Sequence, residues 1–452
     1  MPNEDTLLHL TVTDQSAAPV AAHLGAWVTV TYDRDAYTRD LLNELFGRVV
    51  RYDLWEALVA RGWRAVQREV VELADRYSPQ YVLCPLSMFE LDWSTLVAIR
   101  SRGAFVLAWA ADDTSRFDNY SRWWTGCVDY FLTSNPAFVK KYERLGARAV
   151  YVPCAASPEL FQPSVTVRPP LYDITFVGAP IANRVAAVAA LREAGLHVRT
   201  FGRGWGPLLT LEDMAEVFRR SRINLNFSGS YADCSRKEIK GRVFEITMAG
   251  GFLLTENAPS LSDLYVPFEE LVPFDSVGDA VTLCRRYLAD ETGRLQVAAA
   301  GQARAAKSHT WRARLEETFS KIAQDIAARG RPAAGAEWVA PAPESEVAAA
   351  AAAYHYQWAK ARRATESPLW LEEVCVSIDY QPRDLALRAF SVIGRLPIGW
   401  DPVLLSSKRA CVRLLRPVRR KVAGMTRTKM PRRESCGRDL QPKESDRRPG
   451  AV

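Results

Sequence analysis

Short apolar segments alternate along this chain with amphipathic segments of about ten to fifteen residues, and no other feature limits the fold as strongly. In the first part of the chain, the predicted strands are residues 25–32, 78–86, 103–113, 128–135 and 147–155. The predicted helices between them are residues 33–45, 63–77, 93–102 and 136–145. Strands and helices that alternate in this way are typical of a parallel, doubly wound sheet.

The alternation stops at a proline-bearing stretch, FQPSVTVRPPL at residues 161–171, and then starts again. The second set of predicted strands is residues 172–180, 197–204, 222–228 and 252–256, with helices at 183–194, 211–220, 240–249, 277–288 and 312–328. We therefore expect an α/β fold with two Rossmann-like, doubly wound domains facing a cleft, which is where such folds bind ligands.

The changes of pattern set the expected domain boundaries. One Rossmann-like domain is expected at residues 1–165 and the second at 166–330, followed by a linker and helical extension at 331–407. Within the extension, residues 346–364 form a strong helix by propensity, whereas residues 366–407 allow no fold assignment. Residues 408–452 form a basic tail with few large apolar groups, which is typical of a disordered segment.

The positive charge of the chain lies in that tail. From residue 408 onward, fifteen Lys and Arg residues stand against four Asp and Glu residues, a net +11, so the first 407 residues carry −4 of the total of +7. The tail is open to three interpretations: a solvated extension, an anchor on an anionic membrane surface, or a nucleic-acid contact. Aromatic residues do not interleave with the basic ones, so no nucleic-acid partner is expected.

Other bulk features exclude several classes of protein. The first ten residues, MPNEDTLLHL, carry acids where a secretory signal has bases, and no run approaches the length of a spanning helix. The eight cysteines form no C-x-x-C pair and the five histidines do not cluster, so neither a zinc site nor a disulfide framework is indicated. We expect a cytoplasmic protein, with the tail allowing a peripheral position at the inner membrane surface.

The most informative stretch is KEIKGRVFEITMAGGFLLTE, residues 237–256. Lys240 and Arg242 open a predicted helix, whose N-terminus favours phosphate, and Gly250-Gly251 ends it before a buried strand. Glu245 lies on the same helix face as Arg242 and could accept hydrogen bonds from sugar hydroxyls. The alternative is that Glu238–Arg242 and Arg242–Glu245 are ordinary surface ion pairs at i,i+4 and i,i+3 spacing.

This stretch, together with LSDLY, the acidic turn Phe274-Asp275 and SHTWRARLEE, resembles the C-terminal domain of the CgeB-like (spore maturation protein type) glycosyltransferases. Upstream, DYFLTSNPAFVKKYERLGARAVYVPCAASPELFQP and YDITFVGAPIANR resemble the interdomain region and the second-domain start of the same family. The resemblance covers roughly residues 80 to 325. It implies a GT-B fold in which the C-terminal Rossmann-like domain binds the nucleotide-sugar donor and the N-terminal one lies on the acceptor side.

The resemblance also implies roles for particular residues. Glu245 resembles the carboxylate that holds the ribose or sugar hydroxyls of the donor, and Lys240 and Arg242 match the basic pair near its diphosphate. Gly178 resembles the glycine that lets the phosphates approach, and Arg184 is a third candidate cation. Many retaining GT-B enzymes carry two glutamates separated by seven residues, whereas here Lys237 stands at that position and Glu238 is one off register. A retaining or an inverting outcome therefore stays open.

On the acceptor side, Asp112-Asp113 end a predicted strand and are candidates for the general base or for orienting the acceptor hydroxyl. The alternative is that one of them caps the following turn or helix. Glu90 is a weaker candidate of the same kind. The two aspartates form no D-x-D pair, and we expect no metal and no cofactor besides the nucleotide sugar as co-substrate.

Four further features admit a structural interpretation. FGRGWG at 201–206 shapes the cleft or base pocket, or is a tight turn, and one of Asn224 and Asn226 faces the cleft unless both satisfy local backbone. We expect His309 to cap or pack a helix, and Trp123-Trp124 to pack in the core rather than stack on a sugar.

The sequence therefore predicts a GT-B-type glycosyltransferase that moves a sugar from a nucleotide-sugar donor to an unidentified glycan, lipid, protein or small-molecule acceptor. One alternative is a non-catalytic relative that binds a sugar nucleotide or carbohydrate. The other is a membrane-surface-associated protein that acts through its basic tail.

Overall fold

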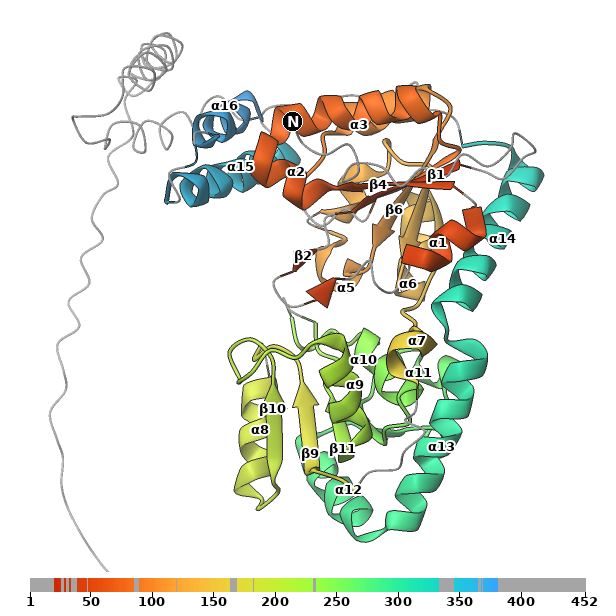
Figure 1. The fold of residues 1–452 in the computed structure, drawn as a ribbon, viewed down its shortest axis with the longest axis vertical. Helices are drawn as coiled ribbons and strands as arrows, with labels where there is room; N and C mark the ends of the chain where they lie inside the picture. Colours follow the sequence, from red (N-terminus) through yellow and green to blue (C-terminus); the bar gives the residue numbers. More distant parts are fainter. Residues whose placement is uncertain are drawn as a thin grey trace, which may run out of the picture.

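The protein folds into two α/β lobes, one above the other in Figure 1, and each is built on a parallel sheet. The computed structural model describes residues 20–25, 28–29, 32–33, 39–46, 48–84, 89–118, 120–162, 169–181, 183–230, 233–332, 345–364, 367 and 369–380. The predicted α/β fold class, with two doubly wound sheets, is confirmed. Residues 333–344 and 381–407 and the basic tail at 408–452 lie outside the described residues.

The first lobe contains a parallel sheet of six described strands. In sheet order they are β4 (Arg48–Asp53), β1 (Val20–Gly25), β5 (Tyr81–Cys84), β6 (Phe105–Ala110), β7 (Tyr130–Thr133) and β8 (Arg148–Tyr151). Its helices are α1 (Arg39–Phe46), α2 (Leu54–Arg61), α3 (Trp63–Tyr77), α4 (Trp93–Ser101), α5 (Asp113–Arg116), the 3₁₀ helix η3 (Ser121–Trp124) and α6 (Pro136–Arg144). The next helix, α7 (Pro158–Phe161), packs on the second lobe, where Phe161 is buried. A short antiparallel pair, β2 (Val28–Thr29) and β3 (Tyr32–Asp33), follows β1.

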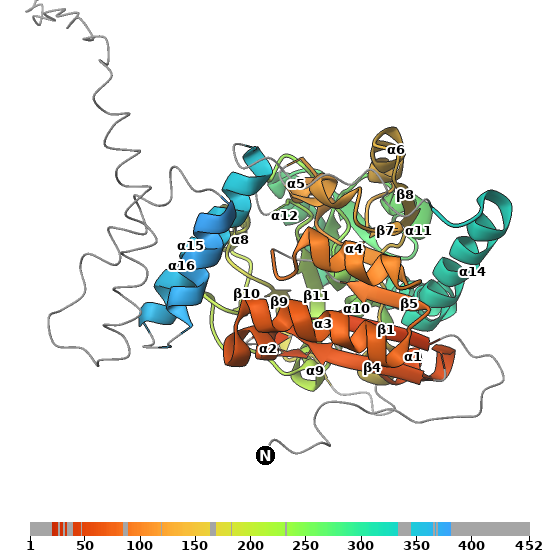
Figure 2. The ribbon, with the colours of Figure 1, turned by 90° about the horizontal axis from the view of Figure 1, so that it is seen from above.

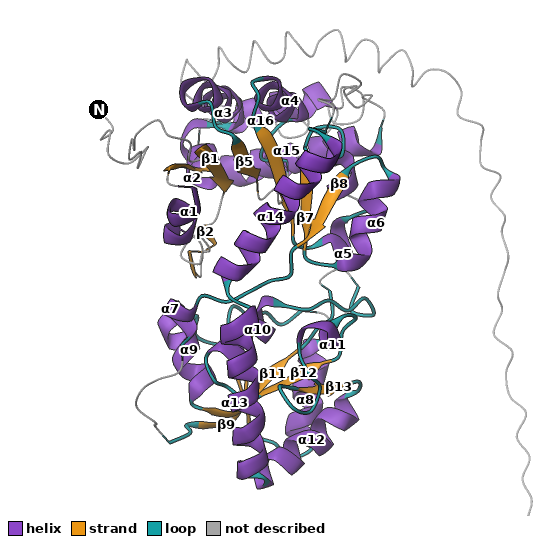
Figure 3. Ribbon diagram, turned by 90° about the vertical axis from the view of Figure 1, so that its right-hand side faces the viewer, coloured by secondary structure: helices purple, strands orange, loops and turns teal. Residues whose placement is uncertain are grey.

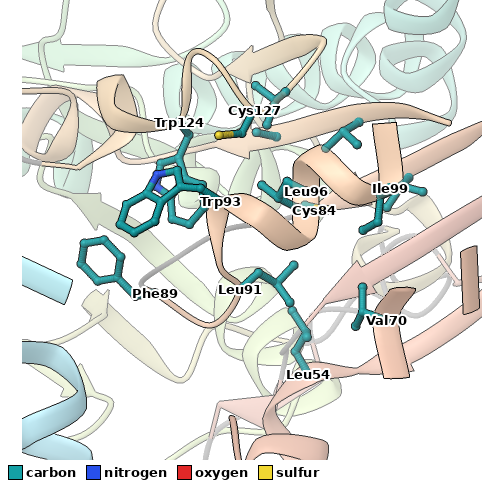
Figure 4. Close-up of a cluster of buried hydrophobic side chains, with 14 of the residues drawn as sticks. Leu54, Val70, Cys84, Phe89, Leu91, Trp93, Leu96, Ile99, Trp124 and Cys127 are labelled. Atoms are coloured by element: carbon teal, nitrogen blue, oxygen red, sulfur yellow. The ribbon is translucent and has the colours of Figure 1, made fainter. Parts of the chain in front are cut away.

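Large aromatic and aliphatic side chains fill one face of this sheet (Figure 4). Trp93 of α4 stacks on Trp124 with ring centroids 5.0 Å apart, and Phe89 lies beside both indoles. Trp123 is partly buried and stacks on Phe89. The prediction that Trp123-Trp124 belong to the core is therefore confirmed.

The second lobe repeats the same winding with five strands among the described residues. Their sheet order is β10 (Val198–Phe201), β9 (Tyr172–Val177), β11 (Ser221–Asn226), β12 (Leu253–Glu256) and β13 (Val272–Phe274), all parallel. The helices are α8 (Arg184–Glu193), α9 (Leu211–Arg219), α10 (Gly241–Met248), α11 (Leu261–Leu264), α12 (Val277–Ala289) and α13 (Glu291–Ser308). In both sheets the first strand lies between the second and the third, so the winding direction reverses there.

The next helix, α14 (Trp311–Arg329), carries the chain back to the first lobe (Figures 1 and 3). Its Leu315 and Ile322 are buried in a cluster with residues of the first sheet, and its Asp325 accepts hydrogen bonds from Tyr130 (2.7 Å) and Arg148 (2.9 Å). The range assigned to the second domain from sequence, 166–330, includes this helix. The amphipathic pattern of α14 shows a buried stripe, but only tertiary contact decides which sheet the stripe covers.

His309 lies where α13 gives way to α14. It is the C-cap residue of α13, and its backbone oxygen accepts a hydrogen bond from Ala156 N–H at 3.0 Å. Its ring is buried between Phe244 and Tyr265, with Nε2 3.0 Å from Leu264 O. The prediction that His309 caps or packs a helix is confirmed.

A helical hairpin after the linker docks on the first lobe. Figure 2 shows α15 (Glu346–Ala364) and α16 (Trp370–Tyr380) side by side. Buried Arg362 donates hydrogen bonds to the carbonyl oxygens of Leu58 and Val59 near the end of α2, and to Glu373 Oε1 at 3.2 Å. Glu372 accepts from Arg64 N–H in the first turn of α3 at 2.8 Å. The hairpin thus supplies partners to the facing ends of two helices.

Element boundaries confirm most of the sequence predictions. The helices predicted at 63–77 and 346–364 have these bounds in the structure. The strand predicted at 25–32 is wrong: the strand in the sheet is β1, and the described residues of 26–33 contain the short pair β2 and β3. VAAHL is rich in alanine and carries a weak strand signal, but parallel pairing with β4 and β5 on both sides selects it. Elements β4, α2, α13 and β13 were not predicted.

Replacing Arg362 tests the docking of the hairpin. We expect Arg362→Met to lower the free energy of unfolding by about 3 kcal/mol, because buried Glu373 loses a cation and two helix carbonyls lose their donor. Urea unfolding measures the change. Arg286→Met, at an exposed residue of α12, is the matched control with an expected change within about 0.5 kcal/mol. Equal effects of the two substitutions would contradict this account of the docking.

Acidification tests the burial of His309. Desolvation lowers the pKa of its imidazole from 6.5 to about 4, so the folded state holds the ring neutral. In the unfolded chain the imidazole gains a proton below pH 6.5, whereas in the folded protein it stays neutral down to about pH 4. The stabilisation that the buried neutral ring contributes is therefore present above pH 6.5 and is lost as the pH falls toward 4. The stability gap between wild type and His309→Gln should therefore narrow by on the order of 2 kcal/mol between pH 7 and pH 4.5 in urea unfolding. A gap independent of pH would show that the ring titrates normally.

Candidate functional site

The carboxyl ends of β9, β11 and β12 form the edge of the second sheet that carries most of the predicted site residues. Gly178 directly follows β9, and Ser228 and Gly229 follow β11. Glu256 is the last residue of β12. The winding reverses between β9 and β11, and open α/β sheets bind ligands outside the strand ends at such a point.

The loop after β9 packs tightly against the loop after β10. Gly178 N–H donates to Phe201 O at 3.0 Å, and a Cβ added at Gly202 would lie 2.5 Å from Gly178 O. Gly202 also has a φ of 116°, which L side chains rarely adopt. FGRGWG is therefore a turn that requires its first glycine, and it supports the backbone at Gly178.

Arg184 begins α8 and turns back toward the same loop. It is 9% exposed, and its Nη1 donates to Ala179 O at 3.3 Å. Burial lowers the pKa of the Arg184 guanidinium and Arg242 lowers it further, while the carboxylates of Glu256 and Glu238 act in the opposite direction. Arg184 thus belongs to one group of interacting charges with residues from β12 and from both sides of the α10 N-terminus.

The predicted opening of the helix at Lys240-Gly241-Arg242 is confirmed, with Lys240 as the N-cap residue of α10. Arg242 pairs with Glu245 one turn later and its Nε lies 3.4 Å from Val177 O at the end of β9. Glu238 forms its ion pair with Lys240 rather than with Arg242. The carboxylates of Glu238 and Glu245 are buried, so neither pair is an ordinary surface ion pair.

One oxygen of Glu238 remains without a hydrogen-bond partner. Glu238 is 8% exposed, and its Oε2 joins Ser230 Oγ and Asn183 Oδ1 among the buried polar atoms that lack one. All three residues lie on the segments that follow β9 and β11. Buried polar groups are satisfied as a rule, so unsatisfied ones together are consistent with a polar ligand at this edge.

Glu256 holds the segment that follows β11. Its Oε2 accepts hydrogen bonds from the N–H groups of Ser228 (2.8 Å) and Gly229 (3.2 Å), and its Oε1 pairs with Lys237. The sequence analysis missed this residue. The signal was present, because an acid that ends a buried strand was the argument used for Asp112-Asp113.

The two adjacent aspartates of the first lobe, Asp112 and Asp113, differ sharply in their environment. Asp112 is the exposed N-cap residue of α5, but its side chain makes no cap hydrogen bond. Asp113 is 1% exposed and accepts from Thr133 Oγ1 (2.7 Å) and Tyr142 OH (2.9 Å), while burial raises its pKa to about 6. The structure thus gives Asp113 an internal bonding role and leaves Asp112 as the accessible carboxylate. The identity of a general base stays a prediction.

Glu90 lies in another environment. It is buried after the carboxyl end of β5, and its electrostatic neighbours include Tyr120 and Tyr354 of α15. The helical hairpin thus covers this part of the first lobe. Among the described residues, Glu90 thus lies with Tyr120 and the helical hairpin of the first lobe.

Asn224 and Asn226 are buried within the second sheet. Asn224 donates to the carbonyl oxygens of Phe218 (3.0 Å) and Phe252 (3.3 Å), while Asn226 donates to Thr255 Oγ1 at 2.9 Å. The local-backbone interpretation is confirmed for Asn224, and Asn226 bonds instead to a neighbouring strand's side chain. Neither is accessible at the edge of the sheet.

The structure therefore brings Gly178, Arg184, Arg242 and Glu245 together around the end of β9, with Lys240 joined to them through Glu238. Asp112 and Asp113 lie on the other lobe, where Thr114 contacts the second lobe through Arg236. Among the described residues, no group of three His, Cys, Asp or Glu is placed to hold a metal ion. Within the same part of the chain, no helix is long and apolar enough to cross a membrane.

Comparison with known proteins bears on the family and the fold. Residues 184–320 match a family model described as glycosyl transferase-like. The fold is similar to sucrose-phosphate synthase from Thermosynechococcus elongatus (TM-score 0.52, 12% identity) and to Anabaena Alr3699/HepE in complex with UDP-glucose (TM-score 0.50, 10% identity). Each comparison covers 69% of this chain and 100% of the other. No curated protein sequence matches. Residues 184–320 are thus similar to a glycosyl transferase-like domain, and the two-lobed α/β fold is similar to that of these two solved structures.

Substitution of Gly202 tests the packing beneath the candidate site. We expect Gly202→Ala to lower the free energy of unfolding by about 2 kcal/mol. The added Cβ would collide with Gly178 O, and alanine disfavours the positive φ that this position requires. Gly195→Ala is the control: Gly195 also has a positive φ, 82°, but its Cβ would meet nothing within 4 Å. Thermal unfolding should show the larger loss at Gly202, and equal losses would refute a special role for the close approach.

Proposed function

We propose that the protein is a glycosyltransferase that moves a sugar from a nucleotide-sugar donor to an acceptor. The observation that carries the proposal is the gathering of Arg184, Arg242 and Glu245 around the Gly178 loop, at the reversal point of the second sheet. The four residues come from three segments of the chain. Arg184, Arg242 and Glu245 lie within the range that matches the glycosyl transferase-like family. A solved structure of similar fold holds UDP-glucose, which supports a nucleotide sugar as the donor.

The charges of this site fit a diphosphate that departs with negative charge. In the transfer, the acceptor oxygen forms a bond to the anomeric carbon while the bond from that carbon to the diphosphate oxygen breaks. Arg184, Lys240 and Arg242 would stabilise the charge that develops on the departing diphosphate, aided by the N-terminus of α10. Without a donor, Glu245 and Glu238 balance two of these cations, so binding exchanges internal ion pairs for pairs with the ligand.

On the acceptor side, the exposed carboxylate of Asp112 is our candidate for receiving the proton of the acceptor hydroxyl. Asp112 follows the carboxyl end of β6, which would place its side chain at the ligand-binding edge of the first sheet. Asp113 would instead hold this end of the sheet by bonding Thr133 and Tyr142. The CgeB-like affiliation, a metal-independent reaction, a cytoplasmic location and membrane contact through the tail remain further parts of this proposal.

A double substitution tests the donor site without leaving a lone buried charge. In a thermal-shift screen of nucleotide sugars, including UDP-glucose, wild type should gain stability on binding, by RT ln(1 + [L]/Kd). Arg242→Gln combined with Glu245→Gln removes both members of one ion pair, and we expect it to weaken donor binding by about tenfold or more. The control is Arg199→Ala at an exposed position of edge strand β10.

The same screen separates the alternatives. Absence of any shift in wild type would refute the donor site, and equal shifts in the double variant would remove Arg242 and Glu245 from it. A shift without turnover toward glycan, lipid, protein or small-molecule acceptors would favour the non-catalytic relative. Loss of function only on deletion of residues 408–452 would favour action through the tail.

A further inference from the structure

The described residues 228–230 and 233–238 leave the second sheet after β11 and run back toward it as a small hairpin. Ser230 N–H donates to Arg236 O and Glu238 N–H donates to Ser228 O, each at 2.9 Å, and Gly229 pairs with Lys237 in antiparallel register. We name this segment the interlobe hairpin. Glu256 binds the N–H groups of Ser228 and Gly229 and the side chain of Lys237. The base of the interlobe hairpin is therefore attached to the end of β12.

The far end of the interlobe hairpin reaches the first lobe. Arg236 Nη1 donates a hydrogen bond to Thr114 O at 3.3 Å. Thr114 lies in α5, adjacent to buried Asp113, and its hydroxyl accepts from Asn135 Nδ2 at 3.0 Å. The carbonyl that Arg236 contacts is therefore part of a turn that is itself fixed to the first sheet through Asp113 and Asn135.

Arg236 is held for this contact from its own side. Its Nε lies 3.4 Å from Asp233 Oδ2, and Asp233 Oδ1 accepts from the N–H and the hydroxyl of Ser235 at 3.0 and 2.6 Å. Hydrogen bonds from Ser235, with a smaller contribution from Arg236, lower the pKa of the Asp233 carboxyl. Asp233, itself held by Ser235, thus restricts the guanidinium of Arg236, whose side chain is half exposed.

We propose that Arg236 is a positioning residue that sets the donor-side edge of the second lobe against the acceptor-side edge of the first. The inference rests on the proposed function for its catalytic consequence, but the interlobe contact itself can be tested without a donor. One hairpin joins Ser228, at the ligand-binding end of β11, to the residue that follows Asp113. Loss of the contact should leave the donor site intact and allow the acceptor edge to move relative to it.

Three variants separate positioning from general charge or stability effects. Arg236→Ala removes the donor, Arg236→Lys retains a cation that can reach a carbonyl, and Arg199→Ala removes an equal charge from an exposed residue of the same lobe. In ligand-free protein, hydrogen exchange is followed at the N–H groups of Ser115, Arg116 and Phe117, which bond to the carbonyls of Asp112 and Asp113. We expect Arg236→Ala to speed this exchange about fivefold, with Arg236→Lys in between and Arg199→Ala unchanged.

With a nucleotide sugar that shifts the melting temperature of wild type, Arg236→Ala should keep the donor KM within about twofold and lower kcat about tenfold, with partial recovery in Arg236→Lys. Unchanged exchange in α5 of Arg236→Ala would overturn the interlobe contact. A donor KM that rises while kcat stays constant would overturn the positioning role. If no nucleotide sugar binds wild type, the proposed function fails, while the exchange measurement still decides the contact.

Discussion

The return of α14 onto the first sheet is the contact on which the arrangement of the whole molecule depends. Leu315 and Ile322 bury their side chains in the first lobe after the chain has completed the second, and Asp325 ties the helix to Tyr130 and Arg148. At the start of the helix, Ala156 bonds to both His309 and Trp311. The chain therefore passes between the lobes twice, once near Ala156 and once near His309. With the lobes joined in this way, the ends of β6 and β9 point toward the same region (Figure 1).

The proposed donor site of the second lobe depends on backbone packing as much as on charge. Gly202 packs against Gly178, and the loop at Gly178 accepts a hydrogen bond from Arg184 through Ala179 O. Buried cations need partners, which Glu245, Glu238 and Glu256 provide in the ligand-free protein. A diphosphate would then enter a site whose dipoles and charges are already oriented, which is the condition for strong electrostatic stabilisation.

The hairpin of α15 and α16 completes the first lobe without joining either sheet. Arg362 and Glu372 satisfy backbone groups at the ends of α2 and α3. Tyr354 of α15 packs against the core cluster that holds Phe89 and Trp93. Glu90 lies beside this hairpin, close enough to Tyr354 for its charge to raise the pKa of that phenol. The strand-end position of Glu90 suggested a functional carboxylate, but long-range packing placed it under the extension.

The sequence by itself determined the two doubly wound sheets, the opening of α10 at Lys240 and the helix at 346–364, because apolar periodicity, caps and propensity are local properties. It could not place β1, since alanine-rich VAAHL becomes a strand only through pairing on both sides. It also could not separate Asp112 from Asp113, because adjacent residues differ in exposure only when Thr133 and Tyr142 arrive from elsewhere. Tertiary structure alone decided that α14 covers the first sheet and that Arg236 reaches Thr114, since both contacts join residues more than a hundred positions apart.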